Sequence, residues 1–282
     1  MTARHRYFAL PLPLISKAVR SGIHELFGAS LLLLVVMVAA AKAASVPRVE
    51  VQGGTLRGTR ADGTLVEGSS LVGTVLYFRS GLVLRIDNVT SSRGLIRYRV
   101  SQRDHHGEWQ TVCPPDSTGS VETYFLQGDW DARGRYWPER NGFSLACVSS
   151  AAGKCLQLGY LPWRRELLPA FQACTRMVRA DYCGDGRSFT REGVVIDVSD
   201  DLGIQFPEPA PGMQFEAAWS PDGAICVHHT RLGQPLADLV RLCPGLAGHV
   251  GRSCTRRTRG AVLENRSFST LELDGQASSK QP

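Results

Sequence analysis

The sequence predicts a mainly β protein of the α+β class, with antiparallel sheets, one central helix and a framework of disulfide bonds. Short apolar runs are frequent, and they are broken by many of the 29 glycines and 15 prolines, the residues that most strongly mark turns. Eight cysteines lie beyond an amino-terminal apolar run. Near the centre, apolar residues recur at helical spacing, at Phe171, Cys174, Met177 and Val178.

The charge of the chain is concentrated near its start. The formal net charge is +6, but residues 1–43 alone hold five basic residues against Glu25. The remainder holds 27 basic and 25 acidic residues, a net charge of +2. A body so close to neutral lacks the basic surface that binding a polyanion such as nucleic acid requires. We therefore expect no nucleic-acid partner.

Residues 1–43 have the pattern of a signal peptide. Residues 29–41 are uncharged and apolar, basic residues precede them, and Ala41-Lys42-Ala43 places small residues where signal peptidase cleaves. The run is shorter than the roughly 20 residues of a membrane-spanning helix. We expect an extracytoplasmic protein (periplasmic, cell-envelope or secreted) without a stable membrane span after cleavage. An uncleaved signal anchor is the alternative.

An exported chain with an even number of cysteines is expected to carry disulfides. The sequence does not select among the possible pairings. Zinc sites use close pairs such as C-x-x-C, and no two cysteines here are nearer than eight positions. We expect neither a metal nor a cofactor. A reduced, nucleophilic cysteine beside His228 or His229 is a further alternative. The cysteines are Cys113, Cys147, Cys155, Cys174, Cys183, Cys226, Cys243 and Cys254.

Residues 44–80 are a glycine-rich β preamble, and the β pattern continues to about residue 160. Alternating or continuous apolar runs predict strands at 49–51, 55–57, 64–66, 73–78, 81–87, 95–100 and 143–148. Asp104, His105 and His106 precede Gly107 and are interpreted as a loop tip rather than a metal site. Residues 128–134 are interpreted as a turn, and residues 151–154 as a hairpin or short loop that leads to Cys155.

The central helix is expected to carry Pro169 in its first turn, where a missing N–H is tolerated, and to stop at Gly184. If the helix continues through Tyr182, Cys174 and Cys183 lie about 13 Å apart along it. A disulfide needs Cα atoms within about 7 Å, so these two cysteines would bond to different partners.

Asp181 and Asp185 are the strongest chemical candidates, because two carboxylates four residues apart near a helix end would serve as acid and base or hold calcium. Calcium loops supply more oxygen ligands at close spacing. The arginines nearby, Arg176, Arg179 and Arg187, favour a structural interpretation, in which arginine–aspartate pairs and an Asp-Gly turn fix the segment.

The carboxy-terminal part returns to β structure. We expect a strand at 193–198, an extended proline-rich loop at 207–211, a hairpin of 215–219 with 225–229, and a loop with a short helix at 231–243. Residues 246–282 carry a basic cluster around Cys254 and end in a segment rich in Ser and Gln. We expect this tail to be largely disordered.

The run R-M-V-R-A-D-Y-C-G-D-G at 176–186 resembles the motif that names the bacterial ADYC domain. G-Y-L-P-W at 159–163, F-E-A-A-W at 215–219, G-A-I-C-V at 223–227 and the Cys-Pro pair at 243–244 are similar to that family in the same order. The resemblance covers residues 81–245 and implies an exported bacterial protein. The family's activity is uncharacterised, so the resemblance implies no catalytic residue. Its motif residues, interpreted as structural, are Arg176, Arg179, Asp181, Tyr182, Asp185 and Gly186.

Two functions follow from these observations. The favoured one is an exported, disulfide-stabilised, non-catalytic module that binds an envelope or extracellular partner, either a protein or a glycan. The alternative is a secreted hydrolase that uses Asp181 or Asp185 with His228 or His229. The hydrolase requires an aspartate and a histidine within hydrogen-bond reach of each other in a cleft.

Overall fold

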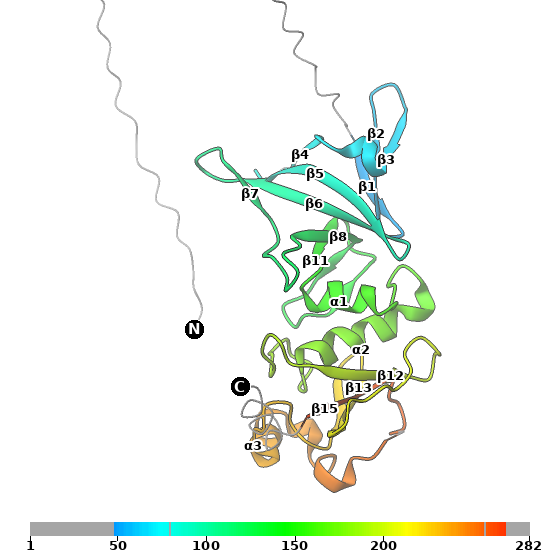
Figure 1. The fold of residues 1–282 in the computed structure, drawn as a ribbon, viewed down its shortest axis with the longest axis vertical. Helices are drawn as coiled ribbons and strands as arrows, with labels where there is room; N and C mark the ends of the chain where they lie inside the picture. Colours follow the sequence, from blue (N-terminus) through cyan, green and yellow to red (C-terminus); the bar gives the residue numbers. More distant parts are fainter. Residues whose placement is uncertain (1–47, 79, 257, 269–282) are drawn as a thin grey trace, which may run out of the picture. The chain divides into compact units, whose positions relative to one another are not determined.

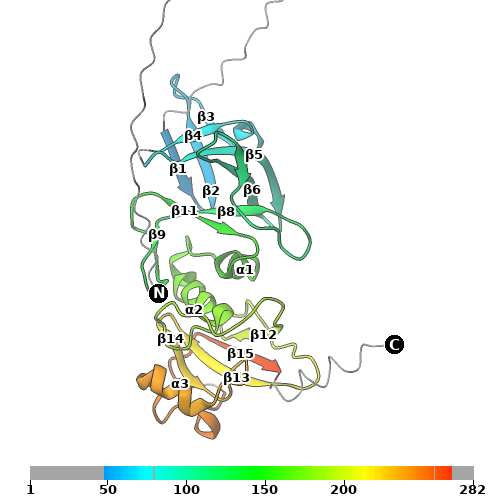
Figure 2. The same cartoon turned by 90° about the vertical axis from the view of Figure 1, so that its left-hand side faces the viewer.

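The computed structural model describes residues 48–78, 80–256 and 258–268. In these residues the chain forms antiparallel sheets and three α-helices (Figures 1 and 2). The fold class expected from the sequence, mainly β with antiparallel sheets and disulfides, is therefore confirmed. The predicted signal peptide and the last residues of the predicted tail lie outside the described residues.

The first half of the chain forms two sheets that share an apolar core. Leu56, Ile86, Tyr98 and Phe125 are all fully buried in this core. The Leu56 amide donates to the Tyr98 hydroxyl over 2.9 Å and so joins the two sheets. The three-stranded sheet has the order β1-β2-β3 and the six-stranded sheet β11-β8-β6-β5-β4, with β7 beside β6. The strands are β1 Arg48–Gln52, β2 Thr55–Thr59, β3 Leu65–Glu67, β4 Val75–Tyr77, β5 Val83–Ser92, β6 Leu95–Arg103, β7 Trp109–Thr111, β8 Glu122–Gln127 and β11 Phe143–Cys147.

Two expected turns lie in this half. The turn expected at 128–134 contains strand β9 (Asp129–Trp130), and the chain turns at 131–135 to reach β10 (Tyr136–Trp137), which pairs with β9. The loop at Asp104 connects β6 and β7, and the Asp104 carboxylate accepts from the amides of His106 and Glu108 over 2.9 Å each. These bonds make the His-His segment a turn organised by its own aspartate.

The carboxy-terminal part of the chain forms a four-stranded sheet in the order β12-β15-β13-β14. Strand β15 lies between two neighbours, although it falls inside the tail that was expected to be largely disordered. That expectation is wrong for residues up to 268. The error arose because β15 is polar in sequence, yet it buries Leu263, Asn265 and Ser267, and Arg266 pairs with Asp197 over 2.7 Å. The strands are β12 Ile196–Asp200, β13 Met213–Ser220, β14 Gly223–Val227 and β15 Leu263–Phe268.

The α-helices are α1 (Ala151–Gln157), α2 (Leu168–Arg179) and α3 (Leu236–Leu242). Helix α1 replaces the hairpin or short loop expected there. It forms because the Ser150 hydroxyl caps it by accepting from the Gly153 amide over 3.1 Å, and because Cys155 and Leu156 are buried. None of the helices in the described residues is long and apolar enough to cross a membrane. Short 3₁₀ turns lie at Gly68–Leu71, Arg165–Leu167, Pro244–Leu246 and Gly251–Ser253.

Helices α1 and α2 lie between the six-stranded and the four-stranded sheet (Figures 1 and 2). Helix α1 contacts β11 and α2, and α2 contacts β13, β14 and β15. Gly153 permits the contact with β11, because a Cβ at this position would lie 2.1 Å from the carbonyl oxygen of Cys147. Phe171, Cys174 and Met177 of α2 are fully buried in the core that surrounds the helices. The predicted apolar positions are therefore buried except Val178, which is half-buried, and α2 also buries residues between them, among them Arg176.

All eight cysteines are paired, and none is free. Cys174 and Cys183 bond to different partners, as expected. Cys155–Cys174 joins α1 to α2, and Cys183–Cys243 joins the segment after α2 to the end of α3. Cys113–Cys147 and Cys226–Cys254 complete the framework.

Replacing both Cys183 and Cys243 by serine should lower the free energy of unfolding by about 4 kcal/mol. The bridge closes a loop with a sequence separation of 60, and this cost follows from the entropy that the bridge removes from the unfolded chain. Urea unfolding of the oxidised protein measures the change. The wild-type protein, alkylated after denaturation without reductant, is the control and should show no free thiol by mass spectrometry. A double variant as stable as the parent would contradict the assigned role of this bridge.

Candidate functional site

The ADYC segment begins where α2 ends. Ala180 adopts a left-handed conformation with φ 50° and closes the helix, although glycine is usual at this position. The helix thus ends earlier than the expected stop at Gly184. The last carbonyls of α2 are all satisfied: Arg176 O accepts from the amide of Asp181 over 2.8 Å, and Arg179 O accepts from the amide of Phe189 over 3.1 Å. The remaining two are capped by a side chain, Arg231.

Arg231 is buried and donates to the carbonyl oxygens of Met177 and Val178 over 2.8 and 3.0 Å. A cation at a helix carboxy terminus also interacts favourably with the helix dipole. The same guanidinium donates to both carboxylate oxygens of Glu216, over 2.9 and 3.0 Å. Arg231 therefore fixes the end of α2 against strand β13.

Three further side chains complete a network that we call the Glu216 cluster, made of Tyr182, Glu216, Trp219, Arg231 and Asn265. The Tyr182 hydroxyl donates to Glu216 over 3.0 Å and accepts from the Arg231 amide over 2.8 Å. Asn265 donates to Glu216 over 2.8 Å and accepts from the Trp219 indole over 2.7 Å. All five side chains are buried.

A β-bulge places Glu216 in the cluster. The pairing of β13 with β15 shifts register between Phe215 and Ala217, so Glu216 is the extra residue, and bulges redirect side chains in this way. Burial raises the pKa of Glu216, but the charge of Arg231 and the hydrogen bonds to the carboxylate outweigh burial and hold the pKa below its ordinary value. Burial, and next the nearby carboxylate, raise the pKa of Tyr182 well above its usual range. The cluster is thus a carboxylate–guanidinium pair with a neutral phenol.

The motif aspartates have structural partners. Asp181 is buried and accepts from Arg176 over 2.6 Å and from the Gly186 amide over 2.9 Å. Arg176 also donates to the carbonyl oxygen of Arg133 over 2.5 Å. Asp185 accepts from the Arg187 side chain over 2.8 Å, and this hydrogen bond, more than any other interaction, lowers the pKa of Asp185.

The motif glycines permit close approaches of the backbone. Gly184 has φ 68°, and a Cβ on it would lie 1.6 Å from the carbonyl oxygen of Asp222 in the β13–β14 turn. Gly186 has φ 90° and accepts a hydrogen bond from Arg179 at its carbonyl oxygen. Only glycine therefore fits at position 184, where the motif contacts this turn.

The histidines of the hydrolase alternative lie beside the cluster but contact other groups. His228 bonds the carbonyl oxygen of Gly251 over 3.1 Å, and His229 bonds the Ser267 hydroxyl over 3.1 Å. No hydrogen bond among the described residues joins either histidine to Asp181 or Asp185. The pair that the hydrolase needs is therefore not assembled in this part of the chain. No group of three or more His, Cys, Asp or Glu in the described ranges is placed to hold a metal ion.

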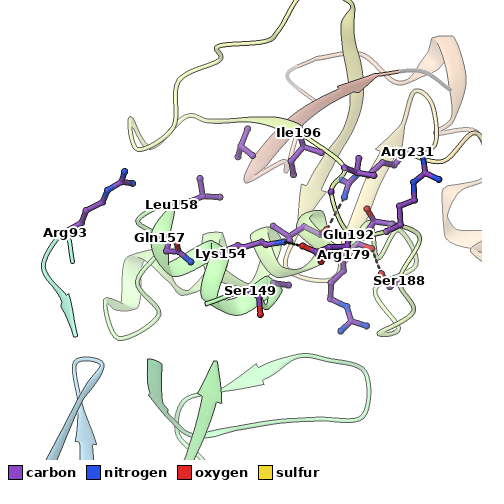
Figure 3. Close-up of a pocket in the computed structure, with 17 residues that line it drawn as sticks. Arg93, Ser149, Lys154, Gln157, Leu158, Arg179, Ser188, Glu192, Ile196 and Arg231 are labelled. Atoms are coloured by element: carbon purple, nitrogen blue, oxygen red, sulfur yellow. Dashed lines mark hydrogen bonds and ion pairs between the residues drawn. The ribbon is translucent and has the colours of Figure 1, made fainter. Parts of the chain in front are cut away.

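A groove lies on the other side of the end of α2. Its cavity of about 550 Å³ is within the size range of small-molecule sites. It lies between α1, the end of α2, the segment at 188–194 and strand β12, and Figure 3 shows Lys154 and Gln157 of α1 with Ile196 on the opposite wall. The apolar wall consists of Ala151, Leu158, Val178, Val194, Ile196 and Val198.

Basic side chains outnumber acidic ones in this groove. Glu192 is the one acidic residue among the described lining residues, and it pairs with Lys154 over 3.6 Å. Arg231 also lines the groove, but Glu216 neutralises it. Arg93 and Arg191 are exposed, and none of the described hydrogen bonds or ion pairs involves their side chains. With Arg179, they give the groove an excess of positive charge.

Of the Glu216 cluster, the sequence analysis singled out Tyr182 alone, and it did not predict the groove. Glu216 is visible as a single acid in the apolar run F-E-A-A-W, a signal that would have identified it. The groove is lined by residues within 149–158 and 178–198, together with Arg93 and Arg231. These parts are separated in the sequence, so no local pattern marks the groove.

The fold and the site define a disulfide-braced α+β domain with a buried ionic cluster and a basic groove. The model of the ADYC domain family matches residues 56–233, more than half of the chain, and the chain therefore belongs to this family. The matched range includes both Glu216 and Arg231. No curated protein and no solved structure matches the chain.

Replacing Tyr182 by phenylalanine should lower the free energy of unfolding by about 1–3 kcal/mol, because the buried Arg231 amide loses its acceptor. Urea unfolding measures the change. Tyr77→Phe is the matched control, since Tyr77 is 76% exposed, and it should leave stability unchanged. Equal stability of the two variants would contradict the role given to the Tyr182 hydroxyl.

Glu216 should make stability depend on pH in the acid range. Its pKa is lowered in the folded state, so the unfolded chain takes up the proton first as pH falls below about 4.3, and stability decreases. Glu216→Gln should remove this contribution. At pH 7 it should lower the free energy of unfolding by about 3–5 kcal/mol, because Arg231 is left buried and unpaired.

Unfolding curves between pH 3 and pH 7 test this expectation, with Glu139→Gln, a change at an exposed glutamate, as the control. A Glu216→Gln protein with the same acid-range slope and the same stability at pH 7 as the control would show that the buried pair has no such effect.

Proposed function

We propose that the protein is an exported, non-catalytic binding module of the periplasm, cell envelope or extracellular space, and that it binds an anionic partner in the groove between α1, the end of α2 and β12. The observation that carries the proposal is an aliphatic wall in a cavity of about 550 Å³ together with two exposed arginines, Arg93 and Arg191, whose side chains pair with no other described residue.

The disulfide framework is compatible with an oxidising compartment, which supports the extracytoplasmic location. The hydrogen bonds and ion pairs of the motif aspartates support a role in binding rather than in catalysis. Asp181 and Asp185 are engaged by arginines and backbone amides, so their charges serve the fold. In the groove, by contrast, cations remain available to a partner.

The small free energy of an exposed ion pair limits how much Arg93 and Arg191 contribute to binding affinity. An exposed ion pair contributes about 0.2–1 kcal/mol, so Arg93 and Arg191 select for negative charge rather than supplying most of the affinity. Binding to the groove should therefore be selective for anions and weakened by salt.

Binding of matched anionic and neutral probes tests the proposal: an oligo-glutamate and an oligo-glutamine peptide, a uronate and a neutral oligosaccharide, and dodecanoate and dodecanol. At least one anionic probe should bind more tightly than its neutral counterpart and shift the amide resonances of residues 188–196. Arg191→Ala should weaken that binding about twofold to fivefold.

The control is Arg99→Ala, which removes an exposed arginine of β6 outside the groove and should leave binding unchanged. The proposal fails if no anionic probe perturbs the groove, or if Arg191→Ala and Arg99→Ala have the same effect.

A further inference from the structure

The groove does not end at Leu158. A second cavity, of about 400 Å³, shares Arg93, Gln157 and Leu158 with the first. It continues past Leu156 and Gly159 to Leu161, and on its other side lie Leu95 and Arg97 of the β5–β6 hairpin. The two cavities together form one extended groove along α1, from the segment at 188–194 to Leu161.

The lining of the extended groove selects an aliphatic occupant. None of its described lining residues is aromatic, whereas sugar rings are usually held against flat aromatic faces. Leu95, Leu158 and Leu161 are only partly buried, so they offer apolar surface that a partner would cover. Such a surface suits an alkyl chain better than a glycan.

Charge is unevenly distributed along the extended groove. In the second cavity, Arg97 donates to the Tyr124 hydroxyl over 2.9 Å and pairs with Glu122 at 3.5 Å. Arg191, whose side chain pairs with no other described residue, lines only the first cavity, whereas Arg93 lines both cavities where they meet. An occupant with one charged end would therefore place that end in the first cavity and its apolar part along Leu158 towards Leu161.

Arg93 lies where the two cavities meet. The β5–β6 hairpin turns through Arg93 and Gly94, with φ 50° and 76°. A turn of this kind favours Asn-Gly or Asp-Gly, and an arginine at positive φ is uncommon. The backbone thus accepts an unfavourable residue at the one point of the hairpin that lines both cavities.

We propose that the extended groove binds a single-chain amphiphilic anion, with its carboxylate or phosphate head among the cations of the first cavity and its unbranched alkyl chain along Leu158 to Leu161. This inference rests on the proposed function, because it names the anion class. An exposed ion pair strengthens binding at most about fivefold, whereas each buried CH₂ strengthens it about fourfold. The chain, rather than the head, should therefore determine affinity.

The test uses the oxidised protein and carboxylates of six, eight, ten and twelve carbons, all below their micelle concentrations, in titration calorimetry. Affinity should increase about fourfold per CH₂, and dodecanol should bind more weakly than dodecanoate. Matched alkyl phosphates distinguish a fatty-acid source from a phosphate-headed lipid. Whichever head binds more tightly identifies the source, and a chain-length dependence with either head supports the inference.

Two further measurements locate the chain. In the wild-type protein, the methyl resonances of Leu95 and Leu161 should shift with dodecanoate but not with hexanoate. This measurement requires no variant. Leu161→Asp should weaken dodecanoate binding at least tenfold and leave hexanoate unchanged, whereas Leu65→Asp, a change at a leucine that is 67% exposed outside the groove, should change neither.

The outcomes separate this inference from the proposed function. If anionic probes bind in an Arg191-dependent way but affinity is independent of chain length, the inference is wrong and the proposed function stands. If an oligo-glutamate peptide binds the groove more tightly than dodecanoate, the occupant is an acidic peptide and the inference is also wrong. If no anion binds the groove, both fail.

Discussion

The ion pair between Glu216 and Arg231 determines where helix α2 meets the four-stranded sheet. Both groups are buried, and a buried ion pair adds little net stability compared with an apolar pair, because its desolvation offsets the attraction. Its effect is on geometry. Arg231 can bond to Glu216 and to the carbonyls of Met177 and Val178 only if the end of α2 lies against β13.

The ADYC motif extends the same constraint along the chain. Ala180 turns the backbone out of the helix, Asp181 folds the next residues onto Arg176, and Tyr182 enters the Glu216 cluster. Cys183 then fixes the segment to Cys243, and Gly184 allows contact with the β13–β14 turn. Within residues 180–184, each residue thus makes a different contact with the rest of the fold. The motif therefore joins α2, α3 and the four-stranded sheet, and substitutions in it should act through the fold.

Local features of the fold were predictable from the sequence, whereas features that depend on partners distant in the chain were not. Pro169 and the apolar spacing identified α2, and the apolar runs at 215–219 and 225–229 identified the β13–β14 hairpin, because helix and strand signals are local. The end of α2 was misplaced because an alanine adopts the left-handed position, while the expected stop, Gly184, serves a backbone contact instead. Strand β15 was missed because its buried polar residues find partners in β12 and β13.

The groove could not be predicted because its geometry follows from the cluster and the disulfides together. Glu216 and Arg231 place the end of α2, and Cys155–Cys174 places α1 beside it. The groove is the space that is left between these two helices and strand β12. Arg231 also forms part of its lining, but Glu216 neutralises its charge, and Glu192 pairs with Lys154. The excess positive charge in the groove therefore comes from Arg93, Arg179 and Arg191. The group that builds the groove is thus distinct from the groups left free to bind. For this reason Arg191 can be removed to test binding without disturbing the fold, whereas Arg231 cannot.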